Sequence, residues 1–146
     1  MKVGAQFKVQ QTGTTVNALY ERMHRDGSVS DYNERTRDLT TWLAVRQQLG
    51  QEDVNLGWAH AGKTPGDPGT GPIDNQANMI AAGLKHHFDP RALLYLVYAQ
   101  QMNHTGAHFD LGASGHGLVV DCKDAEGACF TGTKIKAATA GFIYDF

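Results

Sequence analysis

Residues 136–146 read Lys-Ala-Ala-Thr-Ala-Gly-Phe-Ile-Tyr-Asp-Phe and end on an aromatic side chain. Apolar residues recur here at every second position, from Ala140 through Phe142 and Tyr144 to Phe146. Because successive side chains of a β-strand point to opposite faces, this period of two predicts a strand with one apolar face. A row of this kind that ends in an aromatic suits the surface a membrane barrel presents to lipid.

Strand-like segments of about ten residues, bounded by turn residues, recur along the rest of the chain. Seven are predicted, at 2–9, 15–24, 38–49, 54–61, 77–88, 92–103 and 136–146. Short connections alternate with long ones: the turns are 11–14, 50–53 and 89–91, and the longer loops are 25–37, 62–75 and 104–134. A transmembrane β-barrel alternates in this way, with tight turns at one rim and long loops at the other. The competing interpretation is a soluble all-β domain, which has no reason to place every long loop at one end.

Most of these segments separate an apolar face from a polar one. In the first segment, Val3 and Phe7 oppose Lys8. The sixth segment, 92–103, is apolar on both faces, so the pattern does not assign its register. Trp42 is an exception, because it falls on the polar face of the third segment. The pattern predicts an all-β protein, an antiparallel up-and-down transmembrane β-barrel.

The composition is compatible with such a barrel. Charged residues make up 19% of the 146 residues, and the net charge of −2 gives no reason to expect a nucleic acid as a partner. The mean hydropathy of −0.39 is that of a soluble protein, but alternating lipid-facing and lumen-facing residues average to such a value. No apolar run reaches the ~18 residues of a membrane helix. The start of the chain lacks an apolar signal-peptide core, so we expect either a removed leader or an internal piece of a longer protein.

A series of short motifs runs along the chain: Thr-Trp-Leu-Ala (41–44), Gly-Trp-Ala-His-Ala-Gly-Lys-Thr (57–64), Gly-Leu-Lys-His-His-Phe (83–88), Leu-Tyr-Leu-Val-Tyr-Ala (94–99), Asn103, Phe-Asp-Leu-Gly (109–112), Gly-His-Gly (115–117) and Ala-Gly-Phe-Ile-Tyr-Asp-Phe (140–146). In order and spacing these motifs resemble the general porins of Gram-negative bacteria, the sixteen-stranded trimeric type common in betaproteobacteria. The alternate residues Phe142, Tyr144 and Phe146 resemble the signal that the outer-membrane barrel insertion machinery reads.

The resemblance implies an outer-membrane porin, a water-filled channel for passive diffusion of ions and small hydrophilic solutes. It also implies a homotrimer in the lipid bilayer, and no catalysis, cofactor or metal. Residues 1–146 would be the C-terminal portion of one barrel domain, because seven strands are about half of sixteen. The competing interpretation is a non-conducting structural or adhesive envelope protein that keeps porin-like strands.

Five charged residues on the predicted polar face are candidates for lining the lumen: Lys8, Glu21, Arg46, Lys85 and Asp145. Rings of charge bias the passage of ions, and the slight excess of basic residues indicates a weak preference for anions. The alternative is that these residues lie at the rims or pair with one another.

Two cysteines, Cys122 and Cys129, enclose six residues. This span permits a disulfide, which an oxidising envelope compartment favours. The Gly-rich run 64–71 lacks the Gly-Lys-Ser/Thr ending and the following helix of a phosphate-binding loop, so we expect a solvent-facing loop there. Residues 112–117 lack the second glycine of a nucleophile elbow, and no hydrolase site is predicted.

The histidines do not form a metal-binding pattern. His86 and His87 are adjacent on a predicted strand, so their side chains point to opposite faces and cannot readily chelate one ion. His104 and His108 have ligand-like spacing, but no carboxylate pattern accompanies them. We therefore interpret all four as interface or loop residues.

Overall fold

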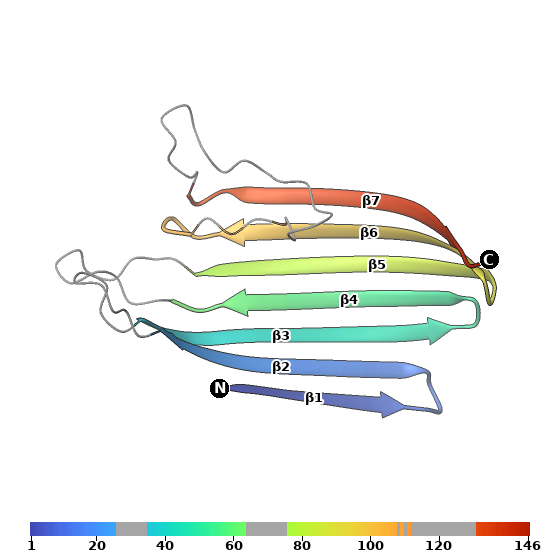
Figure 1. Ribbon diagram of the computed structural model, residues 1–146, viewed down its shortest axis with the longest axis horizontal. Helices are drawn as coiled ribbons and strands as arrows, with labels where there is room; N and C mark the ends of the chain where they lie inside the picture. Colours follow the sequence, from blue (N-terminus) through green and yellow to red (C-terminus); the bar gives the residue numbers. More distant parts are fainter. Residues whose placement is uncertain (26–34, 64–75, 108, 110, 112–130) are drawn as a thin grey trace.

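The computed structural model describes residues 1–25, 35–63, 76–107, 109, 111 and 131–146, and every structural statement below refers to these (Figure 1). The strands are β1 (Lys2–Val9), β2 (Thr14–Arg25), β3 (Arg35–Leu49), β4 (Glu52–Ala61), β5 (Ala77–Asp89), β6 (Ala92–Asn103) and β7 (Lys134–Tyr144). All seven predicted strands are confirmed, with small differences at their ends. The largest consequence is at β4, which begins at Glu52, so the predicted turn 50–53 is shorter than expected.

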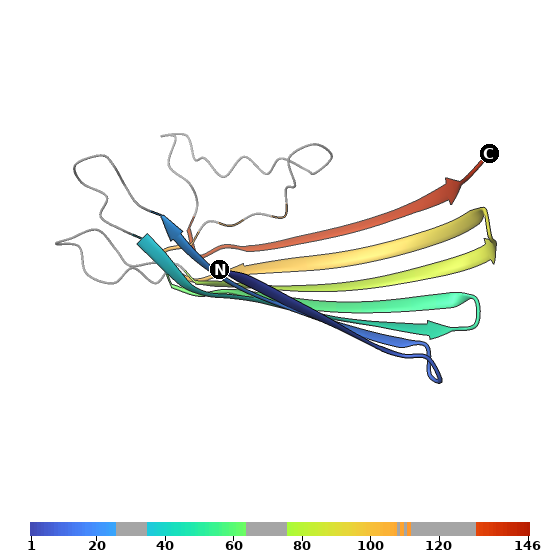
Figure 2. The same ribbon diagram turned by 60° about the horizontal axis from the view of Figure 1, so that its bottom comes forward.

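The strands form one antiparallel sheet in chain order, β1-β2-β3-β4-β5-β6-β7, so each strand pairs with its neighbour in sequence. The prediction of an all-β, antiparallel up-and-down architecture is confirmed at this level. Figure 2 shows the sheet as a single curved layer. The sheet is open, because β1 and β7 form its two edges and do not pair with each other in the described part of the chain.

The three short connections lie together at one end of the sheet, at the right in Figure 1. Two of these turns contain a glycine with positive φ, Gly13 at 69° and Gly50 at 63°, a conformation that L-residues with a side chain rarely adopt. In the third, a carboxylate oxygen of Asp89 accepts hydrogen bonds from the backbone N–H of Arg91 at 2.7 Å and of Ala92 at 2.9 Å. This closure follows from an Asp-Pro turn sequence. The long connections leave from the opposite end, as predicted.

Cross-strand pairing separates two faces. One row of paired residues crosses the sheet as Phe7, Val16, Val45, Leu56, Ala82, Tyr98 and Ala138, and we call this side the apolar face. The adjacent row crosses as Lys8, Thr15, Arg46, Asn55, Gly83, Val97 and Thr139, and we call this side the polar face. The pairing also fixes the register of β6, which the sequence pattern left open.

The sheet has almost no hydrophobic core. The buried apolar residues among those described are Ala77, Ala92 and Ala107, and none of the large side chains there is fully buried. A soluble domain of similar length would bury well over half of the surface its unfolded chain exposes. Here the large apolar side chains are exposed instead, and on the strands all of those exposed except Trp42 and Ile143 lie on the apolar face.

Candidate functional site on the polar face

A hollow of about 620 Å³ lies on the polar face, over strands β1 to β6. Its floor is formed by residues with little or no side chain: Ala44, Gly57, Ala81 and Gly83. A Cβ added at Gly57 would find its nearest neighbours 3.9 Å away, so the floor there is open. Trp42, the exception noted in the sequence, lies on this face and lines the same hollow.

Three of the five predicted lumen residues are brought together at this hollow, namely Lys8, Arg46 and Lys85. The other two are not. Glu21 pairs with Lys2 and Thr40 toward the end of the sheet that carries the long connections. Asp145 follows β7 at the tight-turn end, where its backbone N–H donates to the carbonyl of Arg91. The charge at the hollow is therefore more strongly positive than the five residues together suggested.

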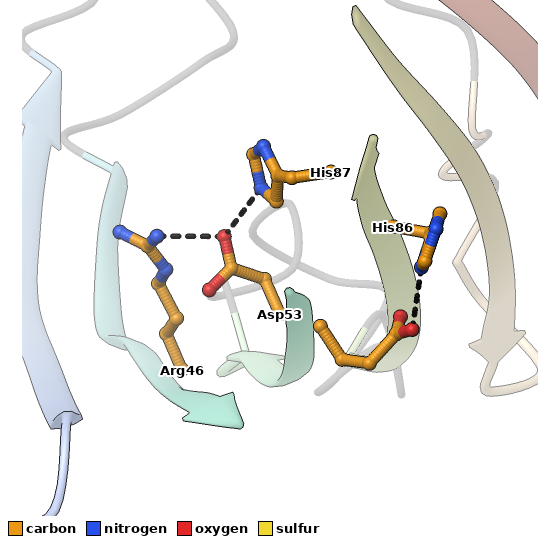
Figure 3. A network of polar contacts seen from close by, with 5 residues as sticks. Arg46, Asp53, His86 and His87 are labelled. Atoms are coloured by element: carbon orange, nitrogen blue, oxygen red, sulfur yellow. Dashed lines mark hydrogen bonds and ion pairs between the residues drawn. The ribbon is translucent and has the colours of Figure 1, made fainter. Parts of the chain in front are cut away.

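Arg46, which lines the hollow, is held by the buried carboxylate of Asp53. Figure 3 shows this contact. Arg46 Nη2 donates to Asp53 Oδ2 at 2.6 Å, and His87 Nε2 lies 3.1 Å from the same oxygen. Asp53 is only 3% exposed, whereas the side chain of Arg46 is 50% exposed. The other carboxylate oxygen, Asp53 Oδ1, is buried with no hydrogen-bond partner among the described residues. Such a carboxylate fixes one side of the guanidinium and leaves the rest of it facing the hollow.

Sequence reasoning missed Asp53, because it counted this residue in a turn. The sequence did contain a signal, because residues two apart on a strand share a face. In a strand that starts at Glu52, Asp53 lies on the same face as Asn55, which is the polar face.

A second polar contact, between His86 and Glu52, lies on the opposite side of the sheet. His86 Nδ1 is 2.6 Å from Glu52 Oε1, and the ring of His86 meets the edge of Phe88 at a centroid distance of 4.5 Å. The prediction that His86 and His87 point to opposite faces is thus confirmed (Figure 3). Within the described ranges, no group of three or more His, Cys, Asp or Glu side chains is arranged to hold a metal ion. The predicted pairs that include His108, Cys122 and Cys129 lie outside the described residues.

The apolar face is exposed on strands across the sheet. Phe7 is 67% exposed, Leu56 57%, Leu96 53% and Phe142 59%. Along β7 this face runs from Tyr144 to Ala138 before it gives way to Lys136, a length of about 20 Å at ~3.4 Å per residue. With the strand tilt of ~40° typical of barrels, that length corresponds to a band about 16 Å tall, which the exposed Phe146 beyond β7 extends toward the ~25 Å apolar band of outer-membrane barrels.

Aromatic residues collect on the apolar face at the tight-turn end. The rings of Phe88 and Phe142 lie 6.3 Å apart, and those of Tyr144 and Phe146 lie 5.3 Å apart. The guanidinium of Arg91 is 5.8 Å from the centre of the Tyr144 ring. The predicted assembly-signal residues Phe142, Tyr144 and Phe146 are all exposed here. Side chains with an aromatic body and a polar or cationic neighbour suit a membrane–water boundary.

No protein-family model matches this chain, and no curated protein or solved structure matches it either. The described residues contain no helix with the length and apolarity needed to cross a membrane.

Proposed function

We propose that the chain forms part of the wall of a bacterial outer-membrane porin, a passive channel through which ions and small hydrophilic solutes diffuse. In this proposal the apolar face contacts lipid and the polar face lines a water-filled lumen. Lys8, Arg46 and Lys85 face the permeating solute, while Glu21 and Asp145 lie nearer the two rims.

One observation carries the proposal: the sheet is a single layer that leaves its large apolar side chains uncovered, and with the exceptions of Trp42 and Ile143 the exposed ones of its strands share one face. Burying one such side chain is worth about 1.5–3 kcal/mol, so a soluble protein gains by covering them with a second layer. Contiguous exposed apolar surface on this scale marks a membrane or protein interface. The continuous apolar band and the aromatic residues at its edge favour lipid as the covering.

The open edges bear on how the barrel would close. A strand edge in lipid leaves backbone N–H and C=O groups without partners, at a cost of several kcal/mol each. We therefore propose that β1 and β7 pair with further antiparallel strands of a larger barrel. The porin resemblance implies that this larger barrel has sixteen strands, forms a homotrimer and is assembled by the barrel insertion machinery.

The polar face favours a conducting porin over a structural envelope protein. A non-conducting barrel needs side chains that fill its interior, as in eight-stranded barrels. Here Gly57, Gly83, Ala44 and Ala81 leave a hollow instead, and charged side chains surround it. Charged side chains around an open hollow must be solvated, so the proposed lumen is filled with water.

The proposal is tested on the assembled protein extracted from bacterial outer membranes and added to planar lipid bilayers. We expect stepwise currents whose size rises in proportion to the salt concentration. Recovery of the protein from the soluble fraction would overturn the membrane assignment. Recovery from the outer membrane with silent bilayers would favour the non-conducting envelope protein.

A further inference from the structure

We infer that the hollow on the polar face is a binding site for small oxyanions, solutes that carry a carboxylate or phosphate group. The inference rests on the proposed function, in which the polar face lines the lumen. It goes further than a general bias among permeating ions, because it assigns a defined site with named donors: Lys8, Arg46 and Lys85.

The charges that line the hollow are of one sign. Of its described lining residues, three are cationic and none is acidic. The ammonium groups of Lys8 and Lys85 have no ion-pair or hydrogen-bond partner among the described residues. The nearest carboxylate with a structural role, Asp53, is buried beneath Arg46 and not exposed to the hollow. An anion entering the hollow therefore meets two lysines without an ion-pair partner in the described part of the chain, and an arginine whose charge only the buried Asp53 offsets there.

The register places Arg46 between the two lysines. Lys8 and Arg46 both pair with Thr15, so their backbones are two strand spacings apart, or about 10 Å. Lys85 pairs with Asp53, which places it two strands and two residues from Arg46, or about 12 Å. Lys8 and Lys85 therefore lie on opposite sides of Arg46, four strands and two residues from each other, or about 20 Å. Arg46 is the centre of the site, and each lysine is placed to share an anion that Arg46 binds.

The floor and the buried carboxylate shape the site. Gly57 and Gly83 carry no side chain, so the anion can approach the sheet closely. Asp53 holds Nη2 of Arg46, and the guanidinium keeps further N–H donors for a planar carboxylate or a phosphate oxygen. Asp53 is therefore a positioning residue, which acts on the anion through Arg46.

Trp42 provides a direct reading of binding, since it lines the hollow while the chain's other tryptophan, Trp58, lies on the apolar face. The detergent-solubilised assembled protein, with Trp58→Phe, is titrated separately with succinate and with inorganic phosphate while Trp42 fluorescence is recorded. The same protein in bilayers under a KCl gradient gives the anion-to-cation permeability ratio. Comparing the two titrations tells a carboxylate site from a phosphate site.

We expect Lys8→Gln and Lys85→Gln each to raise the Kd for the preferred anion by about two- to five-fold. Arg46→Gln, which loses a forked donor, should raise it by about ten-fold. The matched control is Lys136→Gln, because Lys136 pairs with Gln100 on the apolar-face side and does not line the hollow. The permeability ratio should fall in the three hollow variants and stay constant in the control.

Asp53→Asn separates positioning from simple electrostatics. Removing a negative charge near the hollow would by itself strengthen anion binding, whereas releasing Arg46 weakens it, and we expect weaker binding. Equal Kd values in the hollow variants and the Lys136→Gln control, in channels that conduct, would overturn the anion site and leave the porin proposal intact. Saturable anion binding in a protein that carries no current would overturn the porin proposal and leave the anion site intact.

Discussion

The polar face changes character across the sheet, while the apolar face does not. Over β1 to β4 the polar face carries Lys8, Asn17, Arg46 and Asn55, whereas over β6 and β7 it carries residues such as Tyr95, Val97, Ala137 and Ile143. The apolar face remains apolar in both regions. A uniform solvent such as lipid imposes one requirement everywhere, but a lumen tolerates variety. In the proposed porin, contact with solute would therefore be concentrated in β1 to β5, and β6 and β7 would serve mainly to build the wall.

The largest expected effect concerns β6 and β7, which we call the wall-building region; β1 to β5 are the solute region. Deleting Phe146, or replacing it with Asp, should abolish membrane insertion, because it removes the exposed aromatic that extends the row of Phe142 and Tyr144. The measurement is the amount of heat-modifiable, protease-resistant trimer in outer membranes. Lys85→Gln, in the solute region, is the control and should assemble normally. Wild-type amounts of trimer in the Phe146 variants would contradict this division of roles.

A second prediction compares two glycines of the polar face, one from each region. A Cβ at Gly141 would collide with the phenol of Tyr95, which lies across it from β6, whereas a Cβ at Gly57 has its nearest neighbours at 3.9 Å. Overpacking of this kind costs about 1–3 kcal/mol. Gly141→Ala should lower the temperature at which the folded band disappears from semi-native gels, and Gly57→Ala should leave it nearly unchanged. Equal shifts would show that the Tyr95 ring moves aside freely.

A third prediction tests the assignment of faces in the solute region, in a background where both native cysteines are serine. Cysteines at Arg46 and Lys85 should react with small charged thiol reagents, because in the proposed barrel these positions face water. Cysteines at Leu43 and Leu84 should not, because the proposed barrel turns them toward lipid. Equal labelling at all four positions would overturn the register.

The smallest expected difference is the same test on β6, where both faces are apolar. Here Val97 pairs with Gly83 and Thr139 on the polar face, and Leu96 pairs with Leu84 on the apolar face. A cysteine at Val97 should be labelled, more slowly than one at Arg46 because its surroundings are less polar, and a cysteine at Leu96 should not. Faster labelling at Leu96 than at Val97 would show that β6 is shifted by one residue.

Local periodicity explains how much of the fold the sequence predicts. Alternation such as Phe7 against Lys8 assigns both the strand and its faces, and the turn residues mark the hairpins. Where alternation is absent, as in Leu94 to Ala99, the strand is still predicted but its register is not. That register comes from pairing with β5 and β7, which no single segment encodes.

The site was predictable only in part, for a different reason. The alternation of side chains along each strand placed Lys8, Arg46 and Lys85 on one face. It did not give the position of these residues along or across the sheet. It therefore grouped them with Glu21 and Asp145, which the strand offsets place elsewhere. The contact between Arg46 and Asp53 depends on where a two-residue turn begins, and a shift in the assumed start of β4 was enough to hide it.

Pairing only between sequence neighbours has a consequence for the order in which the sheet can form. Bringing two strands together costs chain entropy that rises with the logarithm of the connecting length. The hairpin β5–β6 closes over residues 90–91, whereas β6 and β7 are joined through 104–133. The longer connection raises the entropic cost by about 2 kcal/mol. The strand bearing the terminal aromatic row is thus the one that chain proximity helps least, and its attachment depends on packing such as that of Tyr95 over Gly141.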